Sequence, residues 1–218
     1  MIKMKKYETV LFDLDGTLTD PGEGVTNSVA YALEKFGISV SDKRELYRFI
    51  GPPLLYSFTH FYSFSESDAK KAIGYYREYY SKTGIFQNAI YDGIKELLSD
   101  LKKSGRKLVV ATSKPEHFAK IVLEHFDILK YFDFLGGASL DESRSEKNEV
   151  MEYAVKTCNI DTSRAIMIGD RHFDIDGAKL FGMDSIGVLF GYGTRSELEE
   201  AGATYIVSSA DEIRKILP

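Results

Sequence analysis

The chain is organised around one stretch, Val10-Leu11-Phe12-Asp13-Leu14-Asp15-Gly16-Thr17-Leu18-Thr19-Asp20. Its apolar start predicts a short strand over residues 8–12. Aspartate and glycine are poor strand residues, so we expect the strand to end at Asp13 and the chain to turn there. Catalytic side chains of open α/β sheets lie at such carboxyl ends. Asp13 and Asp15 could divide the work of nucleophile and proton donor, although a simple turn cap would explain the pair equally well.

Composition restricts the class of protein. The 218 residues are 44% hydrophobic and 28% charged, which is typical of a globular protein with one large domain or slightly more. The net charge of −5, without a basic tail, argues against nucleic acid as a partner. We find no apolar run long enough for a membrane span and no signal peptide. A single cysteine, Cys158, excludes an internal disulfide, so we expect a cytoplasmic protein.

Residues 22–84 show helical periodicity and no strand pattern. Helices are expected at 22–36, 42–47, 54–62 and 68–82. This stretch is therefore predicted to be an all-helical insert. We assign residues 1–18 and 88–218 to a core domain and residues 19–87 to the insert. Because the insert directly follows Asp13 and Asp15, it could cover a site there like a lid.

Beyond residue 85, short apolar runs alternate with helical periodicity. Strands are expected at 8–12, 108–111, 132–135, 165–168, 185–189 and 205–207. Helices are expected at 92–104, 116–126, 147–156 and 174–181, with a last helix after the final strand. Alternating strands and helices imply right-handed crossovers. The sequence therefore predicts an α/β fold with a doubly wound parallel sheet.

Reactive side chains follow three of the predicted strands, and Lys147 begins the helix before the last of the three, so we expect all of them to gather at one edge of the sheet. They are Asp13, Asp15, Thr112, Ser113, Lys147, Asp170 and Asp174. Phosphoryl transfer to water needs such a set: a nucleophile, positive charge for the phosphoryl oxygens, and oxygen ligands for a metal. The carboxylates outnumber Lys147 and would repel an anionic substrate unless a divalent cation lay among them. Magnesium fits, because oxygen ligands and a substrate phosphate can complete its octahedron.

Four motifs resemble those of the haloacid dehalogenase-like phosphatases, in the same order. They are Asp13-Leu14-Asp15-Gly16-Thr17, Thr112 at a strand end, Lys147, and Gly169-Asp170-x-x-x-Asp174. The insert resembles the four-helix cap of one branch of that superfamily. Two further segments are similar to phosphoglycolate phosphatase-like proteins: Phe49-Ile50-Gly51-Pro52-Pro53-Leu54 and Gly187-Val188-Leu189-Phe190-Gly191-Tyr192-Gly193. The resemblance implies a Rossmann-like core with a helical cap.

The resemblance also implies a role for each motif residue. Asp13 would attack phosphorus and form an aspartyl-phosphate, and Asp15 would protonate the leaving oxygen and then activate water. Thr112 and Lys147 would hold phosphate oxygens, and Lys147 would also steady Asp13. Magnesium would be bound by Asp13, the carbonyl of Asp15 and Asp170. Asp174 would support the metal from behind these ligands, or cap the following helix.

Four other residues have two interpretations each. Ser113 and Lys114 could contact phosphate or substrate, or cap the helix that begins near Pro115. Arg48, in the insert, could contact a substrate anion, but a surface arginine is the simpler interpretation. His172 lies within the fourth motif, yet Asp15 already fills the role of base, so a place at the rim of the site is expected.

The activity implied is magnesium-dependent hydrolysis of a small phosphomonoester similar to phosphoglycolate. A 5′-nucleotidase acting on nucleoside monophosphates is an alternative, since the aromatic residues of 31–91 permit base stacking; a phosphosugar mutase is another. A dehalogenase would not need an acid at Asp15, and a receiver domain would need neither Asp15 nor the insert. The expected partner is a small phosphorylated metabolite, with no nucleic acid or membrane. The expected oligomeric state is a monomer or a weak homodimer.

Overall fold

Strand β1 (Thr9–Phe12) lies inside a six-stranded sheet in the computed structural model, which describes residues 6–141 and 143–218. The sheet has the order β5-β4-β1-β6-β7-β8, and each pairing within it is parallel. The other strands are β4 (Lys107–Pro115), β5 (Phe134–Ala138), β6 (Ala165–Gly169), β7 (Asp184–Val188) and β8 (Tyr205–Val207). Phe12 is paired with Val110 and with Ile168. The predicted doubly wound parallel sheet is confirmed.

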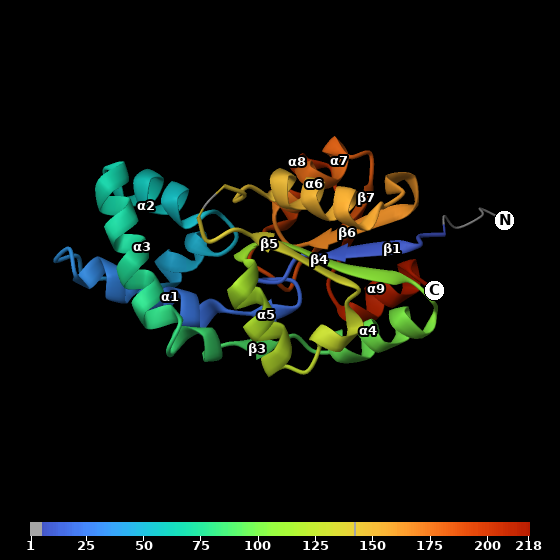
Figure 1. The fold of residues 1–218 in the computed structure, drawn as a ribbon, viewed down its shortest axis with the longest axis horizontal. Coiled ribbons are helices and arrows are strands. Elements are labelled where there is room, and N and C mark those ends of the chain that lie inside the picture. The colour runs from blue at the N-terminus through green and yellow to red at the C-terminus, as the bar shows by residue number, and fades with distance from the viewer. Residues whose placement is uncertain (1–5, 142) are drawn as a thin grey trace. The chain divides into compact units, whose positions relative to one another are not determined.

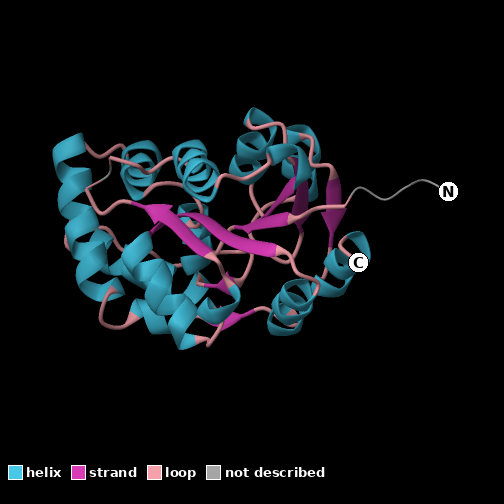
Figure 2. Ribbon diagram, turned by 45° about the vertical axis from the view of Figure 1, so that its right-hand side comes forward, coloured by secondary structure: helices cyan, strands magenta, loops and turns pink. Residues whose placement is uncertain are grey.

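Helices cover both faces of this sheet (Figures 1 and 2). One face carries α4 (Ile94–Lys103), α5 (Glu116–His125) and α9 (Ala210–Ile216), and the other carries α6 (Lys147–Cys158), α7 (His172–Leu180) and α8 (Arg195–Ala201). Side chains alternate along the strands, so Leu11, Val109 and Met167 are fully buried together in the cluster beneath α6 and α7. Both faces of the sheet are thus buried, which explains its continuous apolar runs.

Several elements of the sheet layer differ from expectation, among them β5, which covers Phe134–Ala138 rather than residues 132–135. Strand β4 continues past residue 111 to Pro115, because Pro115 still pairs with Ala138 after an irregularity in register at Thr112. Helix α7 begins at His172, two residues before the predicted Asp174, since the Asp174 carboxylate caps its first turn. Helix α8 was not predicted; it has seven residues, and only Leu198 and Ala201 are buried.

The chain divides into two compact units, Met1–Leu18 with Ile90–Pro218, and Thr19–Ala89. The second unit contains α1 (Gly22–Glu34), α2 (Leu54–Tyr62) and α3 (Glu66–Tyr80), with short 3-10 helices at Lys43–Phe49 and Gly84–Phe86. Short strands β2 (Thr19–Asp20) and β3 (Ala89–Ile90) pair where the chain passes between the units. None of the helices among the described residues is both long and apolar enough to cross a bilayer.

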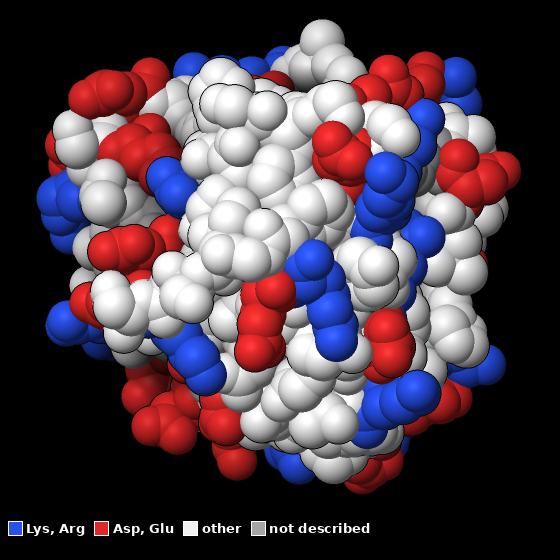
Figure 3. Space-filling model, turned by 90° about the vertical axis from the view of Figure 1, so that its left-hand side faces the viewer, with Lys and Arg blue, Asp and Glu red and all other residues white. Residues whose placement is uncertain are grey.

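Aromatic rings form the interior of the helical unit. Phe49 is buried, and its ring contacts those of Phe58, Phe61 and Tyr62 at centroid separations of 5.1 to 5.9 Å. The surface viewed from the side of this unit has a wide uncharged area, around which acidic and basic side chains are interspersed (Figure 3). The aromatic richness of residues 31–91 therefore has at least partly a packing role.

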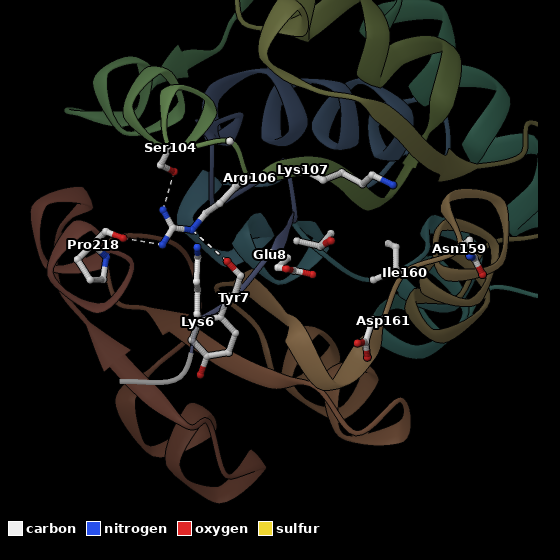
Figure 4. A pocket seen from close by; sticks show the side chains of 12 residues that line it. Lys6, Tyr7, Glu8, Ser104, Arg106, Lys107, Asn159, Ile160, Asp161 and Pro218 are labelled. Atoms are coloured by element: carbon white, nitrogen blue, oxygen red, sulfur yellow. Dashed lines mark hydrogen bonds between the residues drawn. The ribbon is translucent and has the colours of Figure 1, made fainter. Parts of the chain in front are cut away.

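A polar cavity of about 550 Å³ lies at the amino ends of the sheet strands (Figure 4). Arg106 is 9% exposed there and donates hydrogen bonds to the Tyr7 carbonyl, the Ser104 hydroxyl and the Pro218 carbonyl. Burial lowers the pKa of its guanidinium group. Arg106 thus joins the segments that precede β1 and β4 to Pro218.

Candidate active site

Asp13 is the first residue after β1, and the sheet positions its backbone. Its N–H donates to the Ile168 carbonyl at 2.9 Å, which extends the pairing with β6 by one step. The side chain is 5% exposed, and its Oδ1 atom accepts a hydrogen bond of 2.7 Å from the Leu14 N–H. The turn that follows requires Gly16, since this residue has φ of +85° and an added Cβ would lie 2.3 Å from an Asp170 oxygen. The glycine thereby lets Asp13 and Asp170 approach each other.

Lys147 joins three segments of the sheet edge. It is the first residue of α6 and is 6% exposed. Its Nζ atom lies 3.0 Å from Asp13 Oδ1 and 2.8 Å from Asp174 Oδ1, and donates to the Ala111 carbonyl at 3.0 Å. Burial alone would lower the pKa of this ammonium group, but the carboxylates of Asp13 and Asp174 raise it above its usual value. Lys147 is therefore a fixed cation beside Asp13.

Asp13, Asp170 and Asp174 form a buried carboxylate cluster. One oxygen from each lies within 4.8 Å of the others. Burial, followed by the neighbouring carboxylates, raises the pKa of Asp170 well above its usual value, and burial raises that of Asp174 to about 6. The negative charge of the cluster exceeds the single positive charge of Lys147. A divalent cation with oxygen ligands would remove this excess, so the donor set fits the metal expected from the sequence.

A second glycine-rich loop holds Asp170 in place, and the sequence did not reveal this function. The Tyr192 N–H donates to Asp170 Oδ2 at 2.7 Å, and the Thr17 hydroxyl lies 3.4 Å from Asp170 Oδ1. A Cβ on Gly191 would lie 2.2 Å from the Gly16 carbonyl oxygen and 2.4 Å from Asp170 Cβ. The close approach of the two loops thus depends on Gly191, and the glycines at 187–193 were the available signal.

Glu197, on the unpredicted helix α8, supports the loop that carries Asp170 and Asp174. Its Oε1 atom accepts hydrogen bonds from Arg171 Nε at 2.9 Å and from the His172 N–H at 3.0 Å. The Arg171 N–H in turn donates to Asp174 Oδ2 at 3.1 Å. Asp174 therefore both caps α7 and contacts Lys147. No motif marked Glu197 in the sequence.

Asp15 forms an ion pair with Lys114, which the sequence suggested only as a substrate contact or helix cap. Lys114 Nζ lies 2.6 Å from Asp15 Oδ2, and the two side chains are 5% and 15% exposed. Burial raises the pKa of the Asp15 carboxyl, while the charge of Lys114 opposes that rise. Lys114 lies within β4, and helix α5 begins two residues later, at Glu116, with no side-chain hydrogen bond from its N-cap residue Pro115.

The remaining predicted residues have different surroundings. Thr112 is 1% exposed, and its hydroxyl oxygen accepts a hydrogen bond from the Lys114 N–H at 3.2 Å, while Ser113 is half-buried beside it in β4. The His172 ring nitrogen Nδ1 lies 3.0 Å from Asp176 on the surface of α7. Arg48 belongs to the helical unit, where its exposed guanidinium group lies over the rings of Phe61 and Tyr62.

Known proteins are similar to this chain in sequence and in structure. A model of the haloacid dehalogenase-like hydrolase family matches residues 10–188. The crystal structure of a predicted phosphatase from Clostridium acetobutylicum has 53% sequence identity and a TM-score of 0.94, over 96% of this chain and 97% of that one. A 5′-nucleotidase from Pseudomonas aeruginosa is 41% identical over 97% of this chain and 96% of its own length.

Two further relatives carry other names. The tyrosine-protein kinase PtkA from Mycobacterium tuberculosis is 38% identical, over 96% of this chain and 72% of its own length. A phosphoglycolate phosphatase from Colwellia psychrerythraea is 26% identical over 97% of both chains. Proteins similar in sequence to this chain thus bear the names of different activities.

Proposed function

The chain belongs to the haloacid dehalogenase-like hydrolase family and is a phosphatase, and we propose that it hydrolyses a small phosphomonoester with magnesium through a phosphorylated Asp13. The family match confirms the resemblance found in the four sequence motifs. The observation that carries the proposal is the buried cluster of three carboxylates, Asp13, Asp170 and Asp174. Lys147 contacts two of them, Asp13 and Asp174.

The proposed chemistry has two steps. An Asp13 oxygen attacks phosphorus and the bond from phosphorus to the leaving oxygen breaks, while Asp15 gives that oxygen its proton. A water molecule then attacks phosphorus, its proton passes to Asp15, and the bond between Asp13 and phosphorus breaks. Thr112, Ser113 and Lys147 are proposed to hold the phosphoryl oxygens.

Asp13, Asp170 and the Asp15 carbonyl are the proposed ligands of magnesium, with Asp174 behind them. The bound ion would supply positive charge for the phosphoryl group and reduce repulsion between that group and the carboxylates. Support comes from the raised pKa values of Asp170 and Asp174, because burial first, and the neighbouring carboxylates second, disfavour the charged forms of these groups, and a bound cation would offset both effects.

Nucleoside 5′-monophosphates are the second substrate class to be considered beside phosphoglycolate-like esters. They are favoured by one specific observation, the 41% identity to a protein named 5′-nucleotidase against 26% to one named phosphoglycolate phosphatase. We propose that residues 19–87 act as a cap that selects between such substrates, with Arg48 a candidate contact. A monomer or weak homodimer and a cytoplasmic location remain predictions from the sequence.

Release of inorganic phosphate from a panel of phosphorylated metabolites tests the proposal. With magnesium present, we expect turnover of at least one small phosphomonoester, and nucleoside monophosphates and phosphoglycolate should be compared directly. Asp13→Asn serves as the inactive reference. Conversion of sugar phosphate isomers without phosphate release would indicate a mutase. Transfer of a phosphoryl group from ATP to tyrosine, again without phosphate release, would indicate a kinase like the one that PtkA is named for.

A further inference from the structure

Lys114 is a buried lysine whose place in the reaction is not defined by the two steps above. It lies in the polar end of β4, and its side chain is only 5% exposed. A lysine is rarely buried to this degree without a partner. Its ammonium group contacts Asp15, 99 residues earlier in the chain, at 2.6 Å. The two residues belong to the same compact unit.

The two carboxylate oxygens of Asp15 have different surroundings. Oδ2 accepts the hydrogen bond from Lys114. Oδ1 is buried and has no hydrogen-bond partner among residues 6–141 and 143–218. A buried, unpaired carboxylate oxygen is costly in free energy, so native proteins usually provide a partner for it. In the proposed chemistry, the partner of Oδ1 is the leaving oxygen of the substrate in the first step and the attacking water in the second.

The backbone of Lys114 is held on both sides of the residue. Its N–H donates to the Thr112 hydroxyl oxygen at 3.2 Å, and Pro115, the next residue, pairs with Ala138 of β5. The irregular register between Thr112 and Pro115 is therefore a fixed feature of the strand. A lysine side chain has many rotamers, but here hydrogen bonds restrain both the backbone of Lys114 and its Nζ atom.

We propose that Lys114 is a positioning residue, which holds Oδ2 of Asp15 so that Oδ1 carries the proton in both steps. The inference rests on the proposed function. In the first step the proton on Oδ1 passes to the leaving oxygen as that oxygen separates from phosphorus. In the second step Oδ1 receives a proton from water as the water oxygen bonds to phosphorus and Asp13 is released. Lys114 itself exchanges no proton.

A direct contact between Lys114 and the substrate phosphoryl group is the alternative, and a double-mutant cycle separates the two. Wild type, Lys114→Met, Asp15→Asn and the double variant are loaded with acetyl phosphate, whose leaving group needs no proton. After removal of acetyl phosphate, the decay of phosphorylated protein is followed by intact mass. Lys120→Met is the matched control, since Lys120 lies exposed on α5 beside Glu124.

Lys114→Met should slow the decay by about 10- to 100-fold, because a misplaced proton acceptor loses most of its benefit. Its rate of loading should stay close to that of wild type, and Lys120→Met should match wild type in both rates. In the Asp15→Asn background, Lys114→Met should change the decay by less than about two-fold. Losses that multiply, or a loading rate that falls as much as the decay rate, would overturn the inference in favour of direct phosphoryl contact.

The outcomes for this inference and for the proposed function are distinct. If wild type releases phosphate without ever carrying a phosphoryl group, the proposed function fails. If wild type loads and decays normally and Lys114→Met decays equally fast, only the role of Lys114 fails. Should circular dichroism show that Lys114→Met is unfolded, the same cycle is run with Lys114→Gln, which keeps a shorter hydrogen-bond donor, and the same criteria apply.

Discussion

Lys147 and Arg106 are buried cations at opposite edges of the same sheet, and their partners differ. At the carboxyl edge, Lys147 lies within 3.0 Å of two carboxylates, Asp13 and Asp174, with Asp170 in the same cluster. At the amino edge, Arg106 donates to the Tyr7 carbonyl, the Ser104 hydroxyl and the Pro218 carbonyl (Figure 4). One cation is surrounded by an excess of negative charge, and the other by oxygen acceptors that complete its hydrogen bonds.

We propose that this difference separates a site for chemistry from a site for stability. Hydrogen bonds from Arg106 to its three acceptors join chain segments to one another. Burial, together with repulsion from the neighbouring carboxylates, raises the pKa values of Asp170 and Asp174. Such perturbed groups cluster at functional sites because a cation or substrate can relieve their repulsion. The contrast predicts that substitutions at the two edges will affect different properties.

The largest effect on activity is expected when the charge of Asp13, at the carboxyl edge of the sheet, is removed. Asp13→Asn should lower kcat by about 10⁴-fold or more, the size seen when a nucleophile is removed. The fold should persist, because the amide keeps the size of the carboxylate. Phosphate release under saturating magnesium measures the effect, and Asp161→Asn at the amino edge is the control. Activity of the Asp13 variant above about one per cent of wild type would exclude Asp13 as the nucleophile.

Exchanging the two cations for methionine tests the contrast directly. Lys147→Met should lower kcat/KM by about 10²- to 10³-fold, as for other groups that stabilise transition-state charge. Arg106→Met should instead cost about 1–3 kcal/mol of unfolding free energy by leaving acceptors unpaired, with little change in kcat/KM. Kinetics and urea denaturation on both variants provide the measurements. Equal losses of activity in the two variants would remove the distinction between the edges.

A smaller effect is expected in the pH dependence of metal binding. The pKa of Asp174 is raised to about 6 from an ordinary 3.8, and that of Asp170 is raised as well. The folded, metal-free chain therefore binds protons more readily than the unfolded chain. Asp174 adds stability at acid pH that is lost as the pH rises through about 6, and the raised pKa of Asp170 acts in the same direction. Protons compete with the metal for the Asp170 oxygens, and protonation of Asp174 removes negative charge beside the metal, so magnesium should raise the melting temperature more at pH 8 than at pH 5.

Scanning calorimetry with and without magnesium at the two pH values measures this difference, with Asp170→Asn as the variant that should lose it. An equal rise in melting temperature at both pH values would show that Asp170 and Asp174 do not take part in binding the metal.

Local signals explain what the sequence could predict. The change from apolar residues to Asp13 or to Gly169-Asp170 marks a strand end without reference to the rest of the chain, and the structure places both at the same sheet edge. The pairing of Lys114 with Asp15 joins residues 99 positions apart, so no local pattern predicts it. The contact of the Tyr192 N–H with Asp170 uses the backbone and has no side-chain signature. Helix α8 is too short and polar to show clear periodicity.

The central claim is that the carboxyl edge of the sheet positions Asp13 for attack on phosphorus. The most direct test is to identify the residue that carries the phosphoryl group. Asp15→Asn protein is treated with acetyl phosphate and magnesium, quenched rapidly in acid, digested and analysed by mass spectrometry. We expect one phosphoryl group, on the peptide that contains Asp13, and none in the Asp13→Asn form. A phosphoryl group on His172 or elsewhere, in protein that still releases phosphate, would contradict the account.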